Sequence, residues 1–205
     1  MTTLLVTLAS YILGCFSAAY YLFRFSTGDD IRAHGSGNPG ARNIGRQLGP
    51  LAFVATFLID CIKGTASVWL ARYFELAETA VILAMLAVVA GHIWPAQLGF
   101  RGGKGVATVI GAILAFDYKL LIPSVLLLTV AALLMKNFTL AGLIALALLP
   151  LTAAFFGYGG PVLAGMFILT ALIALAHRGN IREIISSTQV RVDKASKPIV
   201  ERSQP

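Results

Sequence analysis

Seven long apolar runs constrain the fold of this chain more than any other feature. They cover about 3–23, 50–71, 79–98, 106–116, 120–135, 139–156 and 160–176. A helix that crosses a bilayer needs about 17–25 apolar residues, and most of the runs approach or reach that length. The run 106–116 would be only roughly 16 Å long as a helix, about half of the hydrocarbon thickness. We expect an all-α, polytopic membrane helix bundle of about seven transmembrane helices, with 106–116 as one short span.

The composition agrees with lipid as the main solvent. Only 12% of the residues are charged, whereas soluble domains average about 25%. The first apolar run is predicted to be a membrane anchor, because no basic residue precedes it and no small-residue cleavage site ends it. We expect one transmembrane domain over 1–191, followed by a flexible cytoplasmic tail over 192–205 that carries charges and lacks a long apolar pattern.

The distribution of basic residues predicts the orientation. If the N-terminus lies outside, the inner connections are 24–49, 99–105, 136–138 and the segment from 177 onward. These hold thirteen of the sixteen Lys and Arg residues, and the outer connections hold only Arg72 and Lys119. Such a bias is typical of the cytoplasmic side. The net charge of +7 suits anionic lipid or an anionic substrate. Nucleic acid is not predicted, because the basic residues carry no aromatic stacking platform around them.

Three polar, glycine-rich motifs lie at the inner ends of apolar runs: 35-GSGNPGARNIGR-46, 99-GFRGGKG-105 and 177-HRGN-180. In the first, closely spaced glycines allow backbone N–H groups to form an anion-binding concavity. Its possible ligands are the hydroxyl of Ser36, the amides of Asn38 and Asn43, and the planar guanidinium groups of Arg42 and Arg46. A solvated loop with tight turns is the alternative interpretation.

The second motif leads directly into the apolar run that starts at Val106. A helix beginning there would present unpaired N–H groups and a partial positive charge, and Lys104 adds a full charge at the same place. The motif is not a nucleotide-binding P-loop, because that pattern needs Gly at 98 and Ser or Thr at 105, where Leu98 and Gly105 stand.

The third motif places His177 and Asn180 at i and i+3, which predicts that both side chains share one helical face. His177 could be a general base, a phosphate donor or an amphipathic boundary residue. Thr139 precedes another span; it is a candidate N-cap and could reach the same pocket.

Asp60 and Lys63 lie inside the second run, where charges are usually paired or functional. We expect a structural ion pair or a bundle contact. His92 is expected to be either a packed, hydrogen-bonded side chain or a group that supports the site. Cys15 and Cys61 are predicted to be inert buried thiols. No cluster has metal-ligand spacing, so no metal and no cofactor are expected.

Taken together, GSGNPGARNIGR, GHIWPAQLGFRGGKGVAT and HRGNI closely resemble the three cytoplasmic motifs of the bacterial acyl-phosphate:glycerol-3-phosphate acyltransferase (PlsY) family, over most of residues 4–190. The resemblance implies transfer of a fatty acyl group from acyl phosphate to the 1-hydroxyl of sn-glycerol 3-phosphate. The products would be lysophosphatidic acid and phosphate, in the first step of bacterial phospholipid synthesis. We expect a monomer in the inner membrane, with the active site facing the cytoplasm.

The resemblance also implies which residues form the site. Ser36, His177 and Asn180 are expected to be catalytic. The expected substrate-binding residues are Gly35, Gly37, Asn38, Arg46, Gly102, Gly103, Lys104, Gly105 and Thr139. The chain departs from the family pattern at Arg42, where threonine is usual, and at Gln189, where glutamate is usual. The extra arginine could tighten phosphate binding or block it.

An acyl phosphate is already activated, so direct attack of the hydroxyl on the acyl carbonyl is expected, without an acyl-enzyme. No His–Asp relay is visible beside Ser36. The His-x4-Asp box of acyl-CoA acyltransferases is absent, since Pro39, Gln97 and Arg182 stand five residues after the three histidines. The alternative function is a membrane transporter of an organophosphate, although transporters usually show internal repeats and polar residues near the midplane.

Overall fold

The computed structural model describes residues 1–135 and 137–186, and its regular structure there is entirely helical. The helices are α1 (Thr2–Cys15), α2 (Ala18–Thr27), η1 (Ile31–Ala33), α3 (Ala41–Leu48), α4 (Pro50–Tyr73), α5 (Glu78–Ile93), η2 (Ala96–Leu98), α6 (Val106–Leu134), α7 (Phe138–Ala147), α8 (Leu149–Phe155) and α9 (Gly160–Ala176), followed by a helix over Arg178–Ser186. The predicted tail at 192–205 and the departure at Gln189 lie outside the described residues.

The expected membrane helix bundle is confirmed. Five segments are long and apolar enough to cross a membrane: Thr2–Thr27, Pro50–Tyr73, Glu78–Leu98, Val106–Leu134 and Phe138–Phe155. A sixth is added if α9 and Arg178–Ser186, which meet at 63°, form one bent span. Large apolar side chains such as Leu58, Ile62 and Trp69 are exposed on the outside of the bundle, as contact with lipid requires. The count of seven spans stays a prediction.

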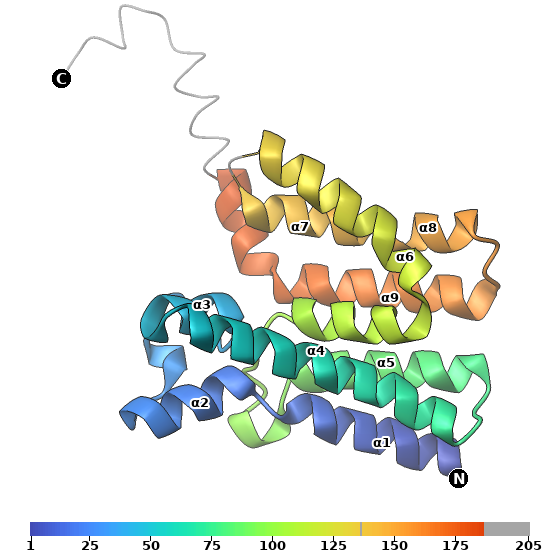
Figure 1. The fold of residues 1–205 in the computed structure, drawn as a ribbon, viewed down its shortest axis with the longest axis horizontal. Coiled ribbons are helices and arrows are strands. Elements are labelled where there is room, and N and C mark those ends of the chain that lie inside the picture. Colours follow the sequence, from blue (N-terminus) through green and yellow to red (C-terminus); the bar gives the residue numbers. More distant parts are fainter. Residues whose placement is uncertain (136, 187–205) are drawn as a thin grey trace, which may run out of the picture.

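The short run 106–116 corresponds to the first part of α6. The helix is interrupted at Asp117, whose backbone is extended (φ −158°, ψ 114°), and Figure 1 shows the chain turning back there. The second part starts with a carboxylate cap, because Asp117 Oδ1 accepts a 2.9 Å hydrogen bond from the N–H of Lys119. Arg72 Nη2 donates to the carbonyl oxygen of Phe116 at 2.6 Å, which satisfies the end of the first part.

The crossing of α4 and α6 depends on two glycines. A Cβ on Gly64 would lie 2.1 Å from the carbonyl oxygen of Thr108, and one on Gly111 would lie 1.9 Å from that of Cys61. Thr65 Oγ1 donates to the carbonyl oxygen of Gly111 at 2.9 Å. Small residues let membrane helices approach closely enough for such contacts. The remaining core is built from apolar side chains of α4, α5, α6 and α9, such as Val68, Met85, Ile113 and Leu169.

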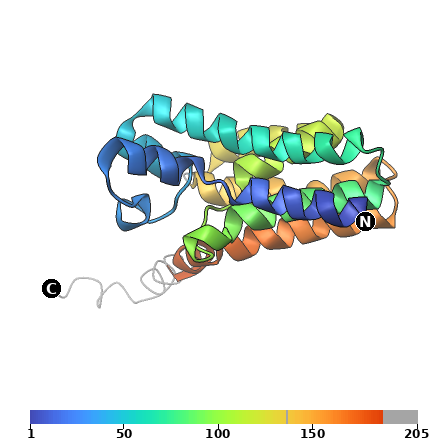
Figure 2. The same cartoon turned by 90° about the horizontal axis from the view of Figure 1, so that it is seen from below.

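The three glycine-rich motifs lie at the same end of the bundle. Figures 1 and 2 show α2, α3, the loop before α6 and the end of α9 at the left, whereas the N-terminus lies at the right. The break at Phe16 and Ser17 separates α1 from α2, so that α2 and α3 extend the bundle at this end. A small separate core of Ala19, Phe23, Ile31, Ile44 and Ala52 holds this extension together.

Candidate active site

The first motif is a loop held in place by a buried asparagine. Gly35 and Gly37 have φ values of +58° and +69°, which favour glycine. Asn43 on α3 is 1% exposed; its Oδ1 accepts the N–H of Ser36 at 3.1 Å, and its Nδ2 donates to the carbonyl oxygen of His34 at 2.9 Å. The amide of Asn43 therefore fixes the loop, and the group that the sequence offers as a possible ligand is used within the protein.

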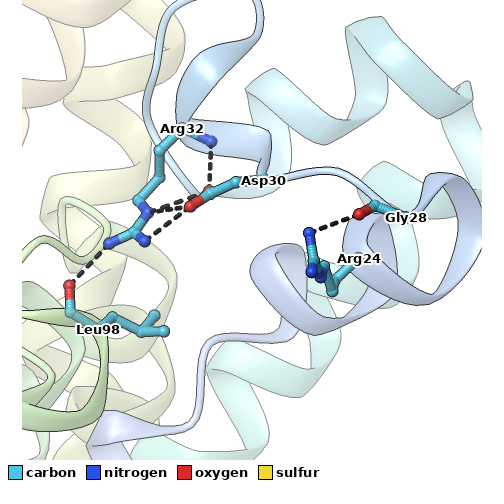
Figure 3. A network of polar contacts seen from close by, with 5 residues as sticks. All are labelled: Arg24, Gly28, Asp30, Arg32 and Leu98. Carbon is cyan, nitrogen blue, oxygen red and sulfur yellow. Dashed lines mark hydrogen bonds and ion pairs between the residues drawn. The ribbon is translucent and has the colours of Figure 1, made fainter.

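Arg32 ties the segment just before the first motif to the residue just before the second motif. This guanidinium pairs with Asp30, with Nη2 2.7 Å from Oδ2, and Nη1 donates to the carbonyl oxygen of Leu98 at 2.7 Å. Figure 3 shows this bridge beside the local contact of Arg24 Nη1 with the carbonyl oxygen of Gly28, at 2.5 Å. The hydrogen bonds from Arg32 hold the pKa of Asp30 below its usual range. The sequence indicates Arg32 only as an inner positive charge.

The second motif folds back onto the end of α5. The N–H of Gly102 donates to the carbonyl oxygen of Ile93, and that of Gly103 to the carbonyl oxygen of His92, each at 3.0 Å. A Cβ on Gly103 would lie 2.2 Å from His92 Nε2. These two glycines are therefore needed for close packing, and their N–H groups are already used. Gly105 is the N-cap of α6, and the first N–H groups of that helix have no partner within it.

The third motif does not form the continuous helical face that its spacing predicts. α9 ends at Ala176, His177 has φ −97° and ψ 7°, and the following helix is turned by 63°. His177 is buried, and its Nδ1 is 2.9 Å from the carbonyl oxygen of Ile173. Burial, and to a smaller extent the charge of Lys104, lowers the pKa of His177, whereas the Ile173 carbonyl acts in the opposite direction. A neutral imidazole that donates from Nδ1 keeps a lone pair on Nε2.

All three motifs meet at a cavity of about 290 Å³. Asn38 lines it from the first motif, residues 100–104 from the second, and Leu175, Ala176, Arg178 and Gly179 from the end of α9 and the helix that follows. The half-buried Lys104 donates from Nζ to Asn180 Oδ1. Among the residues that line the cavity, Arg101, Lys104 and Arg178 are cationic and none is acidic. The cavity is therefore suited to an anion with several oxygen atoms.

Arg101 and Arg178 are not among the predicted site residues, although both stand inside the motifs. Their position beside Lys104 depends on the fold. Of the predicted site residues, Asn38, Gly102, Gly103 and Lys104 line the cavity. The other eight lie outside its lining: Gly35, Ser36, Gly37, Arg46, Gly105, Thr139, His177 and Asn180. Ser36 and Arg46 are exposed on the first loop and α3.

Arg42 connects α3 to the start of α7. Its Nη1 donates to Thr139 Oγ1 at 3.1 Å, and its guanidinium lies 5.4 Å from the centre of the Phe138 ring. The sequence suggests Thr139 as the N-cap of this helix, and this prediction is wrong. Asn137 takes that position, with Oδ1 accepting the N–H of Leu140 at 3.1 Å. Within residues 1–135 and 137–186, no group of three or more His, Cys, Asp or Glu side chains is placed to hold a metal ion.

Comparison with known proteins identifies the family. The family model described as glycerol-3-phosphate acyltransferase matches residues 4–187. A glycerol-3-phosphate acyltransferase 1 of Desulfitobacterium hafniense is 40% identical over 191 residues, covering 93% of this chain and 95% of that protein. One from Bacillus anthracis is 45% identical over 154 residues, covering 75% of this chain and 82% of that protein.

Two crystal structures agree with the fold. PlsY, an integral membrane glycerol 3-phosphate acyltransferase, matches in its glycerol 3-phosphate form with a TM-score of 0.85 and 31% identity, over 91% of this chain and 94% of that chain. Its lysophosphatidic acid form matches with a TM-score of 0.83 and 30% identity, over 91% and 93%. Motifs, fold and relatives agree, and this chain belongs to the glycerol-3-phosphate acyltransferase family.

Proposed function

We propose that this enzyme transfers a fatty acyl group from an acyl phosphate to the 1-hydroxyl of sn-glycerol 3-phosphate, giving lysophosphatidic acid and phosphate. The observation that carries this proposal is the cationic cavity where the three motifs meet, with Lys104 bonded to Asn180. Both substrates bear phosphate groups, which Arg and Lys side chains bind well. The PlsY structures were solved with glycerol 3-phosphate and with lysophosphatidic acid, which are the acceptor and the product of this reaction.

The reaction proceeds by direct transfer. The hydroxyl oxygen of glycerol 3-phosphate attacks the acyl carbonyl carbon, the bond from that carbon to the phosphate oxygen breaks, and the departing phosphate takes the hydroxyl proton. Lys104, Arg46 and the N-terminus of α6 neutralise the phosphate charges. The donor is oriented by Ser36, Asn38 and the turn at Gly35 and Gly37. Thr139 lies at the edge of the site, where it holds the guanidinium of Arg42.

His177 and Asn180 orient the acceptor. Before the attack, the Nε2 lone pair of a neutral His177 accepts a hydrogen bond from the acceptor hydroxyl and so orients it; during the attack this proton passes to the departing phosphate. Asn180 keeps Lys104 in place. Gly102, Gly103 and Gly105 shape the second motif so that the substrate can approach closely. No protein group has to become acylated, because phosphate is already a good leaving group. Isolation of a stable acyl-Ser36 ester would contradict this route.

We further propose that the enzyme is a monomeric protein of the bacterial inner membrane, with the motif-bearing end facing the cytoplasm. Seven spans with the N-terminus outside are consistent with the charge bias of the connections. We also propose that a single transmembrane domain contains the whole site; the end of the predicted domain at 191 and the predicted tail lie outside the described residues.

The acyl donor is tested directly with purified protein in detergent or lipid. Glycerol 3-phosphate with palmitoyl phosphate is expected to yield lysophosphatidic acid and one equivalent of free phosphate, whereas palmitoyl-CoA is expected to yield neither. The products are measured by thin-layer chromatography and phosphate release. Equal rates with the two donors would disprove acyl phosphate specificity, and no product from either would disprove the proposed function.

The pH dependence of activity should change when the charge of Arg42 is removed, because this charge acts on the pKa of Lys104. Burial lowers the pKa of Lys104, the positive charge of Arg42 lowers it further, and Glu183 acts in the opposite direction. Phosphate binding requires the protonated ammonium, so activity falls as the pH rises through this pKa. Arg42→Thr removes a like charge and raises the pKa, so the alkaline limb of kcat/KM should move to higher pH.

The matched control for this experiment is Arg24→Gln, since Arg24 is an exposed arginine with a local partner at Gly28. This substitution should leave the alkaline limb where it is. A limb that stays fixed in Arg42→Thr, or that moves to lower pH, would show that Arg42 does not act on Lys104.

A further inference from the structure

A buried cluster of three ionisable side chains lies next to the second motif, and the reaction proposed above does not use it. Asp60 and Lys63 belong to α4, and His92 belongs to the last turn of α5. They are only 2%, 3% and 5% exposed. Lys63 Nζ lies 2.8 Å from Asp60 Oδ1 and 2.8 Å from His92 Nδ1. Ionisable groups inside a membrane bundle are expensive, and they usually have a function.

Lys63 also holds the end of α1. Its Nζ donates to the carbonyl oxygens of Gly14 at 3.1 Å and Phe16 at 2.7 Å. Gln97 Nε2 donates to the carbonyl oxygen of Cys15 between them, at 2.5 Å. These carbonyls belong to the end of α1, which cannot satisfy them within the helix. The cluster therefore joins the end of α1 to α4 and α5 at the level where the motifs begin.

His92 connects the cluster to the second motif, because it contacts Gly103 through both its backbone and its ring. Its carbonyl oxygen accepts the N–H of Gly103 at 3.0 Å. Its ring packs so closely that a Cβ on Gly103 would lie 2.2 Å from Nε2 and 2.9 Å from Cε1. Lys104 is the next residue along the chain and contacts Asn180. The place of the His92 ring thus determines where the backbone that carries Lys104 can lie.

We propose that Asp60, Lys63 and His92 form a positioning network, which fixes the second motif and thereby holds Lys104 at the phosphate-binding cavity. This inference rests on the proposed function. If the ion pair served only stability, breaking it would lower the unfolding temperature and would not change the KM of one substrate more than that of the other. A positioning network predicts a selective loss of glycerol 3-phosphate use, because a small displacement of a binding group has a large kinetic effect.

The network is tested with two kinds of variant and one matched control. His92→Leu removes the hydrogen-bonding ring at similar volume. Asp60→Asn combined with Lys63→Met removes both charges, so that no lone charge is left buried. The control is Ser67→Ala, because Ser67 Oγ links the same two helices by donating to the carbonyl oxygen of Ala84 at 2.9 Å. Steady-state kinetics with both substrates and the thermal unfolding midpoint are measured for each protein.

Both network variants should lower kcat/KM for glycerol 3-phosphate by about 10- to 100-fold, mainly through KM. The KM for palmitoyl phosphate should change much less. Ser67→Ala should lower the unfolding midpoint and leave both KM values unchanged. His92→Asn can still offer a hydrogen-bond acceptor to Lys63, so its kcat/KM for glycerol 3-phosphate should fall less than that of His92→Leu. Network variants with a lowered midpoint and unaltered KM values would reduce the cluster to a structural role and overturn the proposal.

A double variant tests the contact between His92 and Gly103 itself. Gly103→Ala should strongly raise the KM for glycerol 3-phosphate, because the new methyl group would meet the imidazole ring. The shorter side chain in His92→Asn lacks the ring atoms at that place, so the double variant should recover part of the loss. Independent, multiplicative effects would contradict direct positioning. If the wild-type protein itself makes no lysophosphatidic acid, the proposed function fails; if wild type is active and the double variant shows no recovery, the network inference fails alone.

Discussion

Replacing Lys104 by Met is expected to lower kcat/KM for glycerol 3-phosphate by about 10- to 100-fold. The substitution keeps most of the aliphatic stem and removes the ammonium group that lines the cavity and contacts Asn180. A hydrogen bond to a charged group contributes about 1.5–3 kcal/mol, and about 1.4 kcal/mol corresponds to one factor of ten. The effect should appear mostly as a higher KM for glycerol 3-phosphate, measured at saturating palmitoyl phosphate.

The matched control for this experiment is Lys119→Met. Lys119 is exposed and follows the break at Asp117, at the opposite end of the bundle from the motifs. The Lys119→Met variant should keep wild-type kinetics for both substrates. Lys104→Arg, which retains the charge with a different geometry, should lie between wild type and Lys104→Met. Unchanged kinetics in Lys104→Met would show that the cavity is not where glycerol 3-phosphate binds.

Replacing Gly111 by Ala is expected to give the largest loss of stability among single-methyl additions in the membrane part of the protein. The new Cβ would lie 1.9 Å from the carbonyl oxygen of Cys61 and 2.6 Å from its carbonyl carbon. Both atoms belong to the α4 backbone, which cannot move aside as a flexible side chain would. Forcing extra volume into a packed core costs about 1–3 kcal/mol, so the unfolding midpoint in detergent should fall by several degrees.

Gly142→Ala is the control for this substitution. Gly142 is a helical glycine on α7, and an added Cβ there would meet nothing within 4 Å. Alanine also has the better helix propensity. Its midpoint should therefore equal or exceed that of wild type. If Gly111→Ala unfolds at the same temperature as Gly142→Ala, the close crossing of α4 and α6 at Gly111 and Gly64 does not exist in the folded protein.

Much of the fold could be predicted because hydropathy is a local property. The apolar runs 50–71 and 79–98 correspond closely to α4 and to α5 with η2. The short run 106–116 ends one residue before the break at Asp117. In a bilayer each helix satisfies its own backbone hydrogen bonds, so the composition of a segment largely decides whether it forms one. The ion pair between Asp60 and Lys63, which their position inside an apolar run predicts, is present.

The differences in the site concern groups whose use depends on how the loops fold back onto neighbouring elements. A loop rich in donors predicts Asn43 as a ligand, but the fold turns its amide toward Ser36 and His34. The glycines of the second motif are expected to bind substrate, yet the N–H groups of residues 102 and 103 reach back to the end of α5. The spacing of His177 and Asn180 predicts one helical face, and the chain bends between α9 and the next helix.

A membrane bundle with three anion-binding motifs on one side follows from the amino-acid sequence alone, because each segment carries its own hydropathy, charge and motif spacing. Folding then settles which donors remain for the substrate and which are used within the protein. Arg101 and Arg178 line the cavity, whereas Asn43 and Arg32 make hydrogen bonds that fix the neighbouring loops. This division needs the folded chain, because a hydrogen-bonding group satisfied by one partner is lost to another. The partner is selected by the path of the loops, as for Asn43, or by contact with another segment, as for Arg32 with Leu98.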